Sequence, residues 1–249
     1  MPTVLHTAHF RFYGDLNDFL PAPQQQRELA YSFRGRPGVK DAIEAIGVPH
    51  PEVFYLQVNG AAEGLGYNLS DGDRIHVYPL LRDAIPDGGL LRPLPPSVPD
   101  FVLDGHLGQL ARYLRMLGFD TRYQNDHDDP ALARIADDDG RILLTRDLGL
   151  LKRSRVTHGA FVRATDPKQQ VDEVLARYDL HDAARPMTRC LECNGRVRPV
   201  DKADVLDKLP PQTREDFDEF FRCEKCERVY WKGSHYERMQ RLIQDFIDA

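Results

Sequence analysis

All four cysteines of the chain stand near its end, in two Cys-x-x-Cys pairs: Cys190 with Cys193, and Cys223 with Cys226. Four thiolates on two short loops suit a tetrahedral Zn²⁺ ion and leave it no open coordination position. The sequence therefore predicts a structural zinc site. The 29 residues between the pairs exceed the ~15–20 of a compact ribbon, so we expect an insertion there, with a helix around residues 216–221.

Five aspartates form a second group of candidate ligands. Each follows a short apolar segment predicted to be a strand: Asp104 the first, Asp126, Asp128 and Asp129 the second, and Asp147 the third. Because parallel strands end at one edge of a sheet, we expect these carboxylates to lie together there. They would repel one another unless a cation neutralised them, and oxygen ligands select a hard ion, Mg²⁺ or Mn²⁺. Such an ion can promote hydrolysis of a phosphodiester.

A structural role is the alternative for several of these acids. Asp129 and Asp166 each precede a proline, the arrangement of a carboxylate that caps a helix. Asp104 differs because it directly ends an apolar strand, where an unpartnered charge is costly. Spacing alone leaves open whether Asp104 and Asp147 share a metal ion or are structural.

Apolar periodicity predicts the elements that must position these acids. Short strands alternate with amphipathic helices between residues 101 and 178: strands at 101–103, 119–123, 141–145 and 159–163, and helices at 106–117, 130–138 and 167–178. In the first helix the apolar residues recur every three or four positions until Gly118 ends it. This alternation predicts an α/β fold, a parallel sheet with helices on both faces.

The first 80 residues have a different order of elements. Strands are predicted at 9–13, 27–33, 53–58 and 74–78, with one helix at 39–46. The turn dipeptide Asn59-Gly60 follows the third strand. The order strand, strand, helix, strand, strand suits an α+β, ubiquitin-like β-grasp sheet wrapped on one helix.

A proline-rich stretch separates the two regions. Five of the 18 prolines fall between residues 86 and 99, a density that excludes helix and sheet interiors and predicts an extended linker. We therefore expect four parts: a ubiquitin-like domain at 1–83, the linker at 84–99, an α/β domain at 100–184 and a zinc ribbon at 185–249.

Three motifs of the α/β region resemble a known family. They are FVLDGHLGQLARYLRMLGFD at residues 101–120, the Asp-Asp pair at 128–129 and RILLTRD at 141–147. In combination they resemble the Mut-seven C-terminal domain, a family of PIN-like ribonucleases, and the chain around residues 229–236 resembles the ending of that family. The resemblance implies a PIN-like parallel-sheet nuclease that hydrolyses RNA with a metal ion.

The resemblance also implies which acids hold that ion. In PIN-type nucleases they stand at the first strand, before a middle helix and after the third strand. In this chain those positions are Asp104, Asp128 or Asp129, and Asp147. We add Asp126 as an outer ligand.

Two arginines and a tryptophan are candidate RNA contacts. The lysine familiar in the first helix of PIN-type nucleases is Gln109 here, and we expect Arg112 and Arg115, on the polar side of that helix, to take its place. A merely solvated face is the alternative. Trp231 stands in a run of aromatic and basic residues of the kind that stacks on single-stranded nucleic acid, with core packing as the alternative.

A basic cluster follows the third strand of the α/β region: Arg146, Lys152, Arg153 and Arg155. We expect these side chains to steady phosphates of the substrate. The net charge of −6 excludes a protein that coats nucleic acid indiscriminately through a global basic field. Local patches of this kind must therefore hold any RNA.

The N-terminal region resembles the β-grasp fold of small sulfur-carrier proteins, on four segments: residues 10–20, 39–44, 58–60 and 71–75. Those carriers act through a free C-terminal Gly-Gly, whereas Gly88-Gly89 here is followed by 160 residues. We therefore expect a linker diglycine and a domain that docks a protein partner. A sulfur-carrier fusion would require cleavage of the chain after Gly89.

Composition bounds the class of protein. The 249 residues are 41% hydrophobic, enough for one large core or two modest ones. No run approaches the ~20 apolar residues that span a membrane, and the N-terminus lacks the basic flank and apolar core of a secretion signal. Because clustered cysteines of this kind indicate a reducing compartment, we expect a cytoplasmic protein without membrane partners.

These features together predict a metal-dependent ribonuclease with a Mg²⁺ or Mn²⁺ site for catalysis and a zinc ribbon that aids RNA binding. Its substrate would be RNA, including structured RNA such as tRNA. The competing class is a non-catalytic RNA-binding or adaptor protein in which the acids are structural. Convergence of Asp104, Asp128 and Asp147 on one cation site would distinguish the two.

Overall fold

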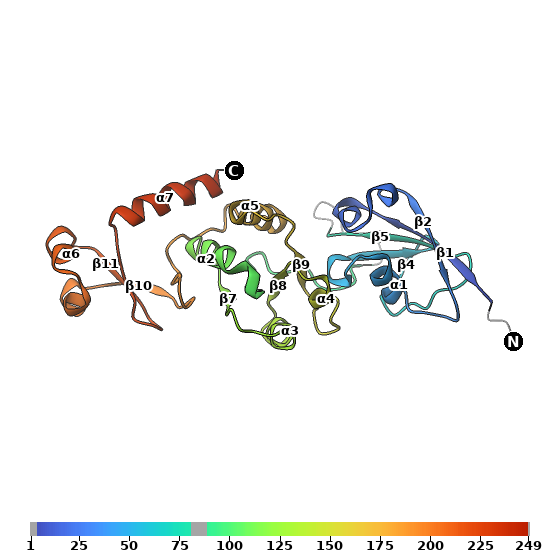
Figure 1. Ribbon diagram of the computed structural model, residues 1–249, viewed down its shortest axis with the longest axis horizontal. Coiled ribbons are helices and arrows are strands. Elements are labelled where there is room, and N and C mark those ends of the chain that lie inside the picture. The colour runs from blue at the N-terminus through green and yellow to red at the C-terminus, as the bar shows by residue number, and fades with distance from the viewer. Residues whose placement is uncertain (1–3, 81–88, 249) are drawn as a thin grey trace. The chain divides into compact units, whose positions relative to one another are not determined.

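The computed structural model describes residues 4–80 and 89–248 (Figure 1). The chain forms two compact units: Met1–Leu94 with Asp147–Phe161, and Pro95–Arg146 with Val162–Ala249. The first unit therefore includes a segment from within the predicted nuclease domain. In the ranges described, no helix is both long and apolar enough to cross a membrane.

The first unit is built on a mixed five-stranded sheet. Its elements are β1 (His6–Phe12), β2 (Glu28–Phe33), α1 (Val39–Ile46), β3 (Tyr55–Val58), β4 (Ala61–Ala62) and β5 (Arg74–Tyr78), with 3-10 helices at Gly14–Phe19, Ala22–Gln24 and His50–Glu52. The strand order is β2-β1-β5-β3-β4, and only the central β1–β5 pair is parallel. The predicted order of strands and helix is confirmed.

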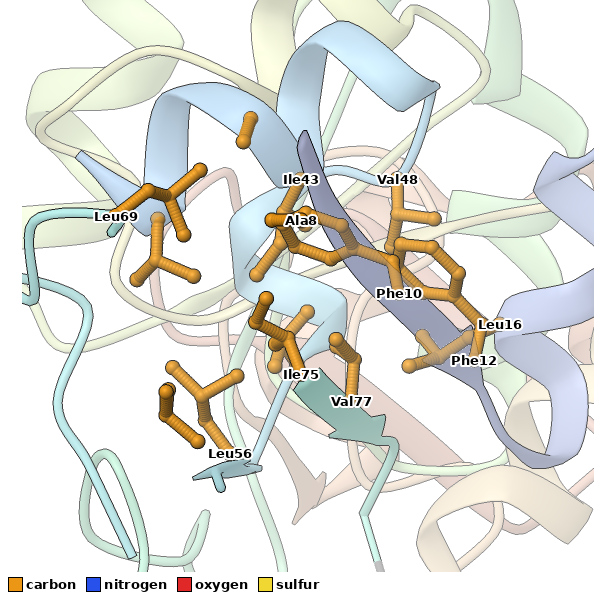
Figure 2. Close-up of a cluster of buried hydrophobic side chains, with 14 of the residues drawn as sticks. Ala8, Phe10, Phe12, Leu16, Ile43, Val48, Leu56, Leu69, Ile75 and Val77 are labelled. Carbon is orange, nitrogen blue, oxygen red and sulfur yellow. The ribbon is translucent and has the colours of Figure 1, made fainter. Parts of the chain in front are cut away.

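A hydrophobic core joins this sheet to α1 (Figure 2). Figure 2 shows Phe10 and Phe12 of β1 and Ile75 and Val77 of β5 gathered with Ile43 of α1, and each is at most 2% exposed. The alternating pattern of β1 and β5 places these side chains on one face because successive strand residues point to opposite sides. One face of the sheet thus covers the apolar stripe of the helix.

The turn after β3 has the predicted chemistry. Asn59 and Gly60 both have positive φ, 53° and 85°, which a two-residue hairpin turn requires at both central positions. Asparagine and glycine are the residues that adopt this conformation at least cost. The dipeptide therefore sets the register in which β4 pairs with β3.

The segment Asp147–Phe161 packs against the sheet domain of the first unit. It forms α4 (Leu148–Leu151) and β9 (Gly159–Phe161). The backbone N–H of Phe161 donates to the carboxylate of Glu52 at 2.7 Å, and Glu52 is fully buried. The ammonium of Lys152 donates to the carbonyl of Glu44 at 2.7 Å. These bonds attach the segment that follows Asp147 to the N-terminal domain.

Arg92, within the predicted linker, adds a buried clamp to the first unit. Its guanidinium donates to the carbonyls of His50, Val53 and Thr157 at 2.5 to 2.9 Å, and the side chain is 8% exposed. Because Thr157 belongs to the segment Asp147–Phe161, Arg92 ties this segment to the N-terminal domain. At Arg92 the linker is therefore bound to the first unit by hydrogen bonds. Of the linker diglycine, Gly88 lies outside the described residues.

The second unit contains the parallel sheet. Its elements are β6 (Phe101–Leu103), α2 (Gly108–Met116), β7 (Thr121–Tyr123), α3 (Asp129–Asp138), β8 (Ile142–Thr145) and α5 (Pro167–Tyr178), with a 3-10 helix at Gly105–Leu107. Strands β7, β6 and β8 are neighbours in this order and run parallel. Helices α2 and α5 pack on each other on one side of these strands, and α3 packs on the other side (Figure 1). The predicted mixed α/β fold is confirmed.

The same unit ends in a small antiparallel sheet of β10 (Val197–Val200), β11 (Phe220–Cys223) and β12 (Val229–Trp231), which with its two Cys-x-x-Cys turns we call the cysteine ribbon. A 3-10 helix at Lys202–Lys208 and α6 (Pro211–Asp216) lie between β10 and β11, and α7 (Ser234–Ile247) follows β12. On α7, the ring of Phe246 packs against Tyr113 of α2, with centroids 5.5 Å apart.

The insertion within the ribbon is present, but the helix expected at 216–221 is wrong. Helix α6 ends at Asp216, and the chain is already extended in β11 from Phe220. Phe220 is 2% exposed and packs with Val205 and Leu209 in a small core of the insertion. Pairing with β10 and β12 on both sides therefore holds this part of the chain as a strand.

Candidate functional site

The four cysteines converge at one point of the cysteine ribbon. Their Sγ atoms all lie within 4.8 Å of one another, with Cys190 and Cys226 at 3.6 Å and Cys193 and Cys223 at 3.4 Å, and all four are free thiols. Zinc–sulfur bonds of ~2.3 Å in a tetrahedron place sulfurs ~3.8 Å apart. The cluster therefore has the donor set and the size to hold a metal ion such as zinc.

Both Cys-x-x-Cys loops close with the same turn. The N–H of Asn194 donates to the carbonyl of Cys190, and the N–H of Glu227 donates to that of Cys223, both at 3.0 Å. Asn194 and Glu227 have positive φ, 65° and 58°. At Gly195 a Cβ atom would lie 2.8 Å from the Cys223 sulfur. Glycine is therefore required where the backbone passes the sulfurs.

Arg115 of α2 holds the first cysteine loop against the parallel sheet. Its guanidinium donates to the carbonyls of Thr121, Leu191 and Glu192 at 2.9 to 3.1 Å. The side chain is 5% exposed, so the expectation that Arg115 lies on a solvent-facing side of its helix is wrong. Burial lowers the pKa of Arg115, and the nearby charges of the cysteine loop act in the opposite sense. Its bonds are those of a structural clamp.

Asp120 is the second anchor of the ribbon on the sheet. Its carboxylate accepts from Arg141 at 2.7 Å and from the side-chain amide of Asn194 at 2.8 Å, and it pairs with Arg189 at 2.9 Å. The other end of the Asn194 amide accepts from the N–H of Thr121. Burial acts to raise the pKa of Asp120, but the hydrogen bonds and the two arginine charges hold it below its usual value.

Asp104 stands where β6 ends, beside the end of β8. Its N–H donates to the carbonyl of Leu144 at 3.1 Å, and its Oδ2 accepts from the hydroxyl of Thr145 at 2.7 Å. Thr145 is fully buried, whereas Asp104 is half-buried. A buried hydroxyl thus orients the carboxylate at the carboxyl edge of the sheet, where open α/β folds bind ligands.

The acids after β7 begin a helix. The N-cap of α3 is Asp128, whose Oδ1 accepts from the N–H of Ala131 at 2.8 Å, and Asp129 is the first residue of the helix. The cap expected at Asp129 is therefore one residue earlier. Asp126 is exposed in the preceding loop. The cap predicted at Asp166 is confirmed by its bonds to the first turn of α5.

Asp147 belongs to the first unit, where it caps α4. Its Oδ1 accepts from the N–H groups of Gly149 at 2.6 Å and Leu150 at 3.2 Å. Across the part of the chain that the structure describes, the cysteine cluster is the only group of three or more His, Cys, Asp or Glu ligand atoms gathered within 4.8 Å. A cation site shared by Asp104 and Asp147 remains a prediction.

The predicted basic contacts fall into two kinds. The guanidinium of Arg146 donates to three backbone carbonyls, those of residues 162 to 164, and Lys152 is bonded within the first unit as described above. Arg153 and Arg155 are exposed, and the side chain of Arg112 is 54% exposed. Among the predicted basic contacts, the exposed side chains are thus those of Arg112, Arg153 and Arg155.

Several residues that support these groups could not be recognised from the sequence. Asp120, Asn194 and Tyr230 act through partners more than 35 positions away in the chain, and no local pattern marks them. Gly195 carried a signal, since a glycine two residues after a Cys-x-x-Cys motif indicates a close approach to the metal ligands. Trp231 is half-buried and packs in part against the small core of the ribbon insertion.

Comparison with known families gives two adjacent matches. Residues 99–243, more than half of the chain, match the family model described as the Mut7-C RNAse domain, and residues 5–84 match the one described as Mut7-C ubiquitin. Searches of the curated proteins and of the solved structures returned no match. The first match spans the parallel sheet and the cysteine ribbon, and the second spans the mixed sheet of the first unit. The chain therefore belongs to the Mut7-C RNAse domain family and carries a Mut7-C ubiquitin domain at its N-terminal end.

Proposed function

We propose that this protein is a metal-dependent ribonuclease of PIN-like fold that hydrolyses RNA phosphodiester bonds. The observation that carries the proposal is the match of residues 99–243 to an RNAse family, which includes every acid that the sequence placed at the sheet edge. The position of Asp104 at the end of β6, fixed by the buried hydroxyl of Thr145, supports it.

The proposed site uses Asp104 and Asp147 as ligands of a Mg²⁺ or Mn²⁺ ion. Asp128 or Asp129 closes the site, and Asp126 is an outer ligand. Asp147 follows β8 by two residues, and β8 is the direct neighbour of β6. This adjacency supports the proposed pairing of the two acids. A bound hard cation supplies an activated water and a positive charge near the leaving oxygen.

The residues of this chain prepare that chemistry by orientation. Thr145 fixes Asp104, and the helix N-termini of α3 and α4 fix Asp128 and Asp147 through one carboxylate oxygen each. One oxygen of each carboxylate is therefore already engaged, which limits the orientations that each side chain can adopt.

The cysteine ribbon has a structural role in this proposal. Its four cysteines hold Zn²⁺, and the folded ribbon adds RNA contacts through Arg112 and Trp231 beside those of Arg153 and Arg155. We do not include Arg115 among the proposed RNA contacts, because its guanidinium donates to backbone carbonyls. We further propose that the ubiquitin domain docks a protein partner, and that structured RNA such as tRNA is among the substrates.

The test compares wild-type protein with Asp104→Asn and Asp147→Asn on the same RNA with added Mn²⁺. Both substitutions keep size and remove one charge from the cation site, so we expect turnover and metal affinity to fall together. Asp138→Asn, at the exposed C-terminal end of α3, is the matched control and should cleave like wild type. If both site variants cleave as fast as wild type, Asp104 and Asp147 are structural and the proposed site is wrong. If wild type itself does not cleave RNA with added Mn²⁺, the chain is a non-catalytic RNA-binding or adaptor protein.

A further inference from the structure

An open groove of about 680 Å³ crosses the second unit between α2, the cysteine ribbon and α7. Among the residues that line it are five half-buried aromatic side chains: Tyr113, Phe217, Tyr230, Trp231 and Tyr236. They come from four different parts of the chain, so tertiary structure alone assembles this surface. We call these five rings the floor of the groove.

Two rings of the floor, Tyr230 and Trp231, are held in place. The hydroxyl of Tyr230 lies 3.0 Å from the sulfur of Cys190 and accepts from the N–H of Leu191 at 3.2 Å. Trp231 is the last residue of β12 and packs against the core of the ribbon insertion. Rings that are already ordered lose little conformational entropy when a ligand stacks on them.

Charged side chains also line the groove. Three are exposed arginines, Arg112, Arg228 and Arg238, which we call its rim, and two are the acids Glu192 and Asp216. Arg112 and Arg228 both approach the same oxygen of Glu192, at 3.7 and 3.4 Å. Three guanidinium groups against two carboxylates leave the lining of the groove with a net charge of +1.

We propose that this groove binds unpaired nucleotides of RNA, with bases stacked on the aromatic floor and phosphates along the arginine rim. The proposal rests on the ribonuclease function proposed above, and it assigns single-stranded RNA segments as the substrate class of that ribonuclease. Exposed base faces and a chain of negative charges match the two features of the groove. A duplex hides its base faces, and an apolar peptide leaves the arginine rim unused.

The chain carries its own probe, because Trp231 is its only tryptophan. We would titrate full-length Asp104→Asn protein with an oligouridine of about ten nucleotides, a length within the range of single-strand sites. Neither divalent cation nor chelator is added, so the RNA stays intact and the cysteine cluster is undisturbed. We expect quenching of the tryptophan fluorescence by the single strand, and none by an RNA duplex of the same length.

Two variants test the rim and the floor. Arg228→Ala should weaken binding and lower the salt dependence of the binding constant by about 0.7, the value for one phosphate of a single strand. Tyr236→Ala should weaken binding about fivefold or more through loss of stacking. Arg198→Ala is the matched control, since Arg198 is also an exposed ribbon arginine paired with a glutamate, Glu224, at 3.4 Å, and binding should be unchanged.

The proposal is overturned if the oligouridine leaves the fluorescence unchanged, if the duplex binds equally well, or if Arg228→Ala and Arg198→Ala behave alike. Displacement of the RNA by an uncharged amphipathic peptide at equal concentration would identify the groove as a protein-docking site instead. None of these outcomes depends on the acids of the proposed catalytic site. The protein can therefore bind RNA in the groove without cleaving it, and it can cleave RNA without binding it in the groove. The two proposals can fail separately.

Discussion

Replacement of Arg115 by methionine tests whether this side chain stabilises the fold or contacts RNA. Methionine keeps an unbranched apolar stem of similar length and removes the guanidinium. Three carbonyls, those of Thr121, Leu191 and Glu192, then lose their donor, and the bonds to the first two are buried. An unsatisfied buried polar group costs about 1–3 kcal/mol, and local relaxation recovers part of this cost. We therefore expect the free energy of unfolding of the second unit to fall by about 4 kcal/mol.

Arg112→Met is the control, because Arg112 lies one turn earlier on the same helix. Its side chain is 54% exposed, and its pair with Glu192 spans 3.7 Å. Exposed ion pairs of this kind contribute about 0–1 kcal/mol. The same substitution should therefore cost several times less at Arg112 than at Arg115.

Denaturant unfolding followed by the fluorescence of Trp231 measures both variants, and thermal unfolding should place the Arg115→Met midpoint roughly 10 °C below wild type. The salt dependence of RNA binding, measured on the folded variant, should be unchanged by Arg115→Met. The reasoning is refuted if Arg115→Met is as stable as Arg112→Met while its salt dependence falls by the value of one phosphate contact.

Three further predictions concern the metal, pH and the first unit. Removal of metal from the four-cysteine cluster by a strong chelator should unfold the cysteine ribbon, since structural zinc contributes about 10–16 kcal/mol in small fingers. The circular dichroism signal of the strands in the first unit should remain, and metal analysis should find one zinc per chain. Thermal unfolding that does not change with chelator contradicts this prediction. The pKa of Asp120 is held below its usual value, so its carboxylate should stabilise the fold above the unfolded pKa of ~3.9 and lose that effect as the pH falls through the lower folded pKa. The difference in unfolding free energy between wild type and Asp120→Asn should be constant near neutrality and shrink below about pH 4. A difference that does not depend on pH contradicts this prediction. Arg92→Met should loosen the segment Asp147–Phe161 from the N-terminal domain and speed tryptic cleavage after Arg153 and Arg155, whereas Arg11→Met, at an exposed position on β1, should leave the cleavage rate at its wild-type value.

Short-range patterns in the sequence determined the order of the elements and the metal-binding cysteines. Alternation in β1 and three-to-four periodicity in α2 follow from the geometry of strand and helix, so each could be recognised within ten residues. The Asn59-Gly60 turn needs only two residues with positive φ. The two Cys-x-x-Cys loops are equally local, because each turn is closed by a bond between a cysteine carbonyl and an N–H four residues later.

Tertiary structure alone decided what the charged side chains do. Arg115 borders the apolar stripe of α2, and helical periodicity cannot tell whether solvent or another part of the chain covers that border. The carbonyls that it binds stand 76 and 77 positions later, at a loop whose place depends on the whole unit. Arg92 likewise reaches Thr157 across 65 positions. A guanidinium can satisfy its donors with phosphates or with backbone carbonyls, and only the folded chain determines which acceptors lie within reach.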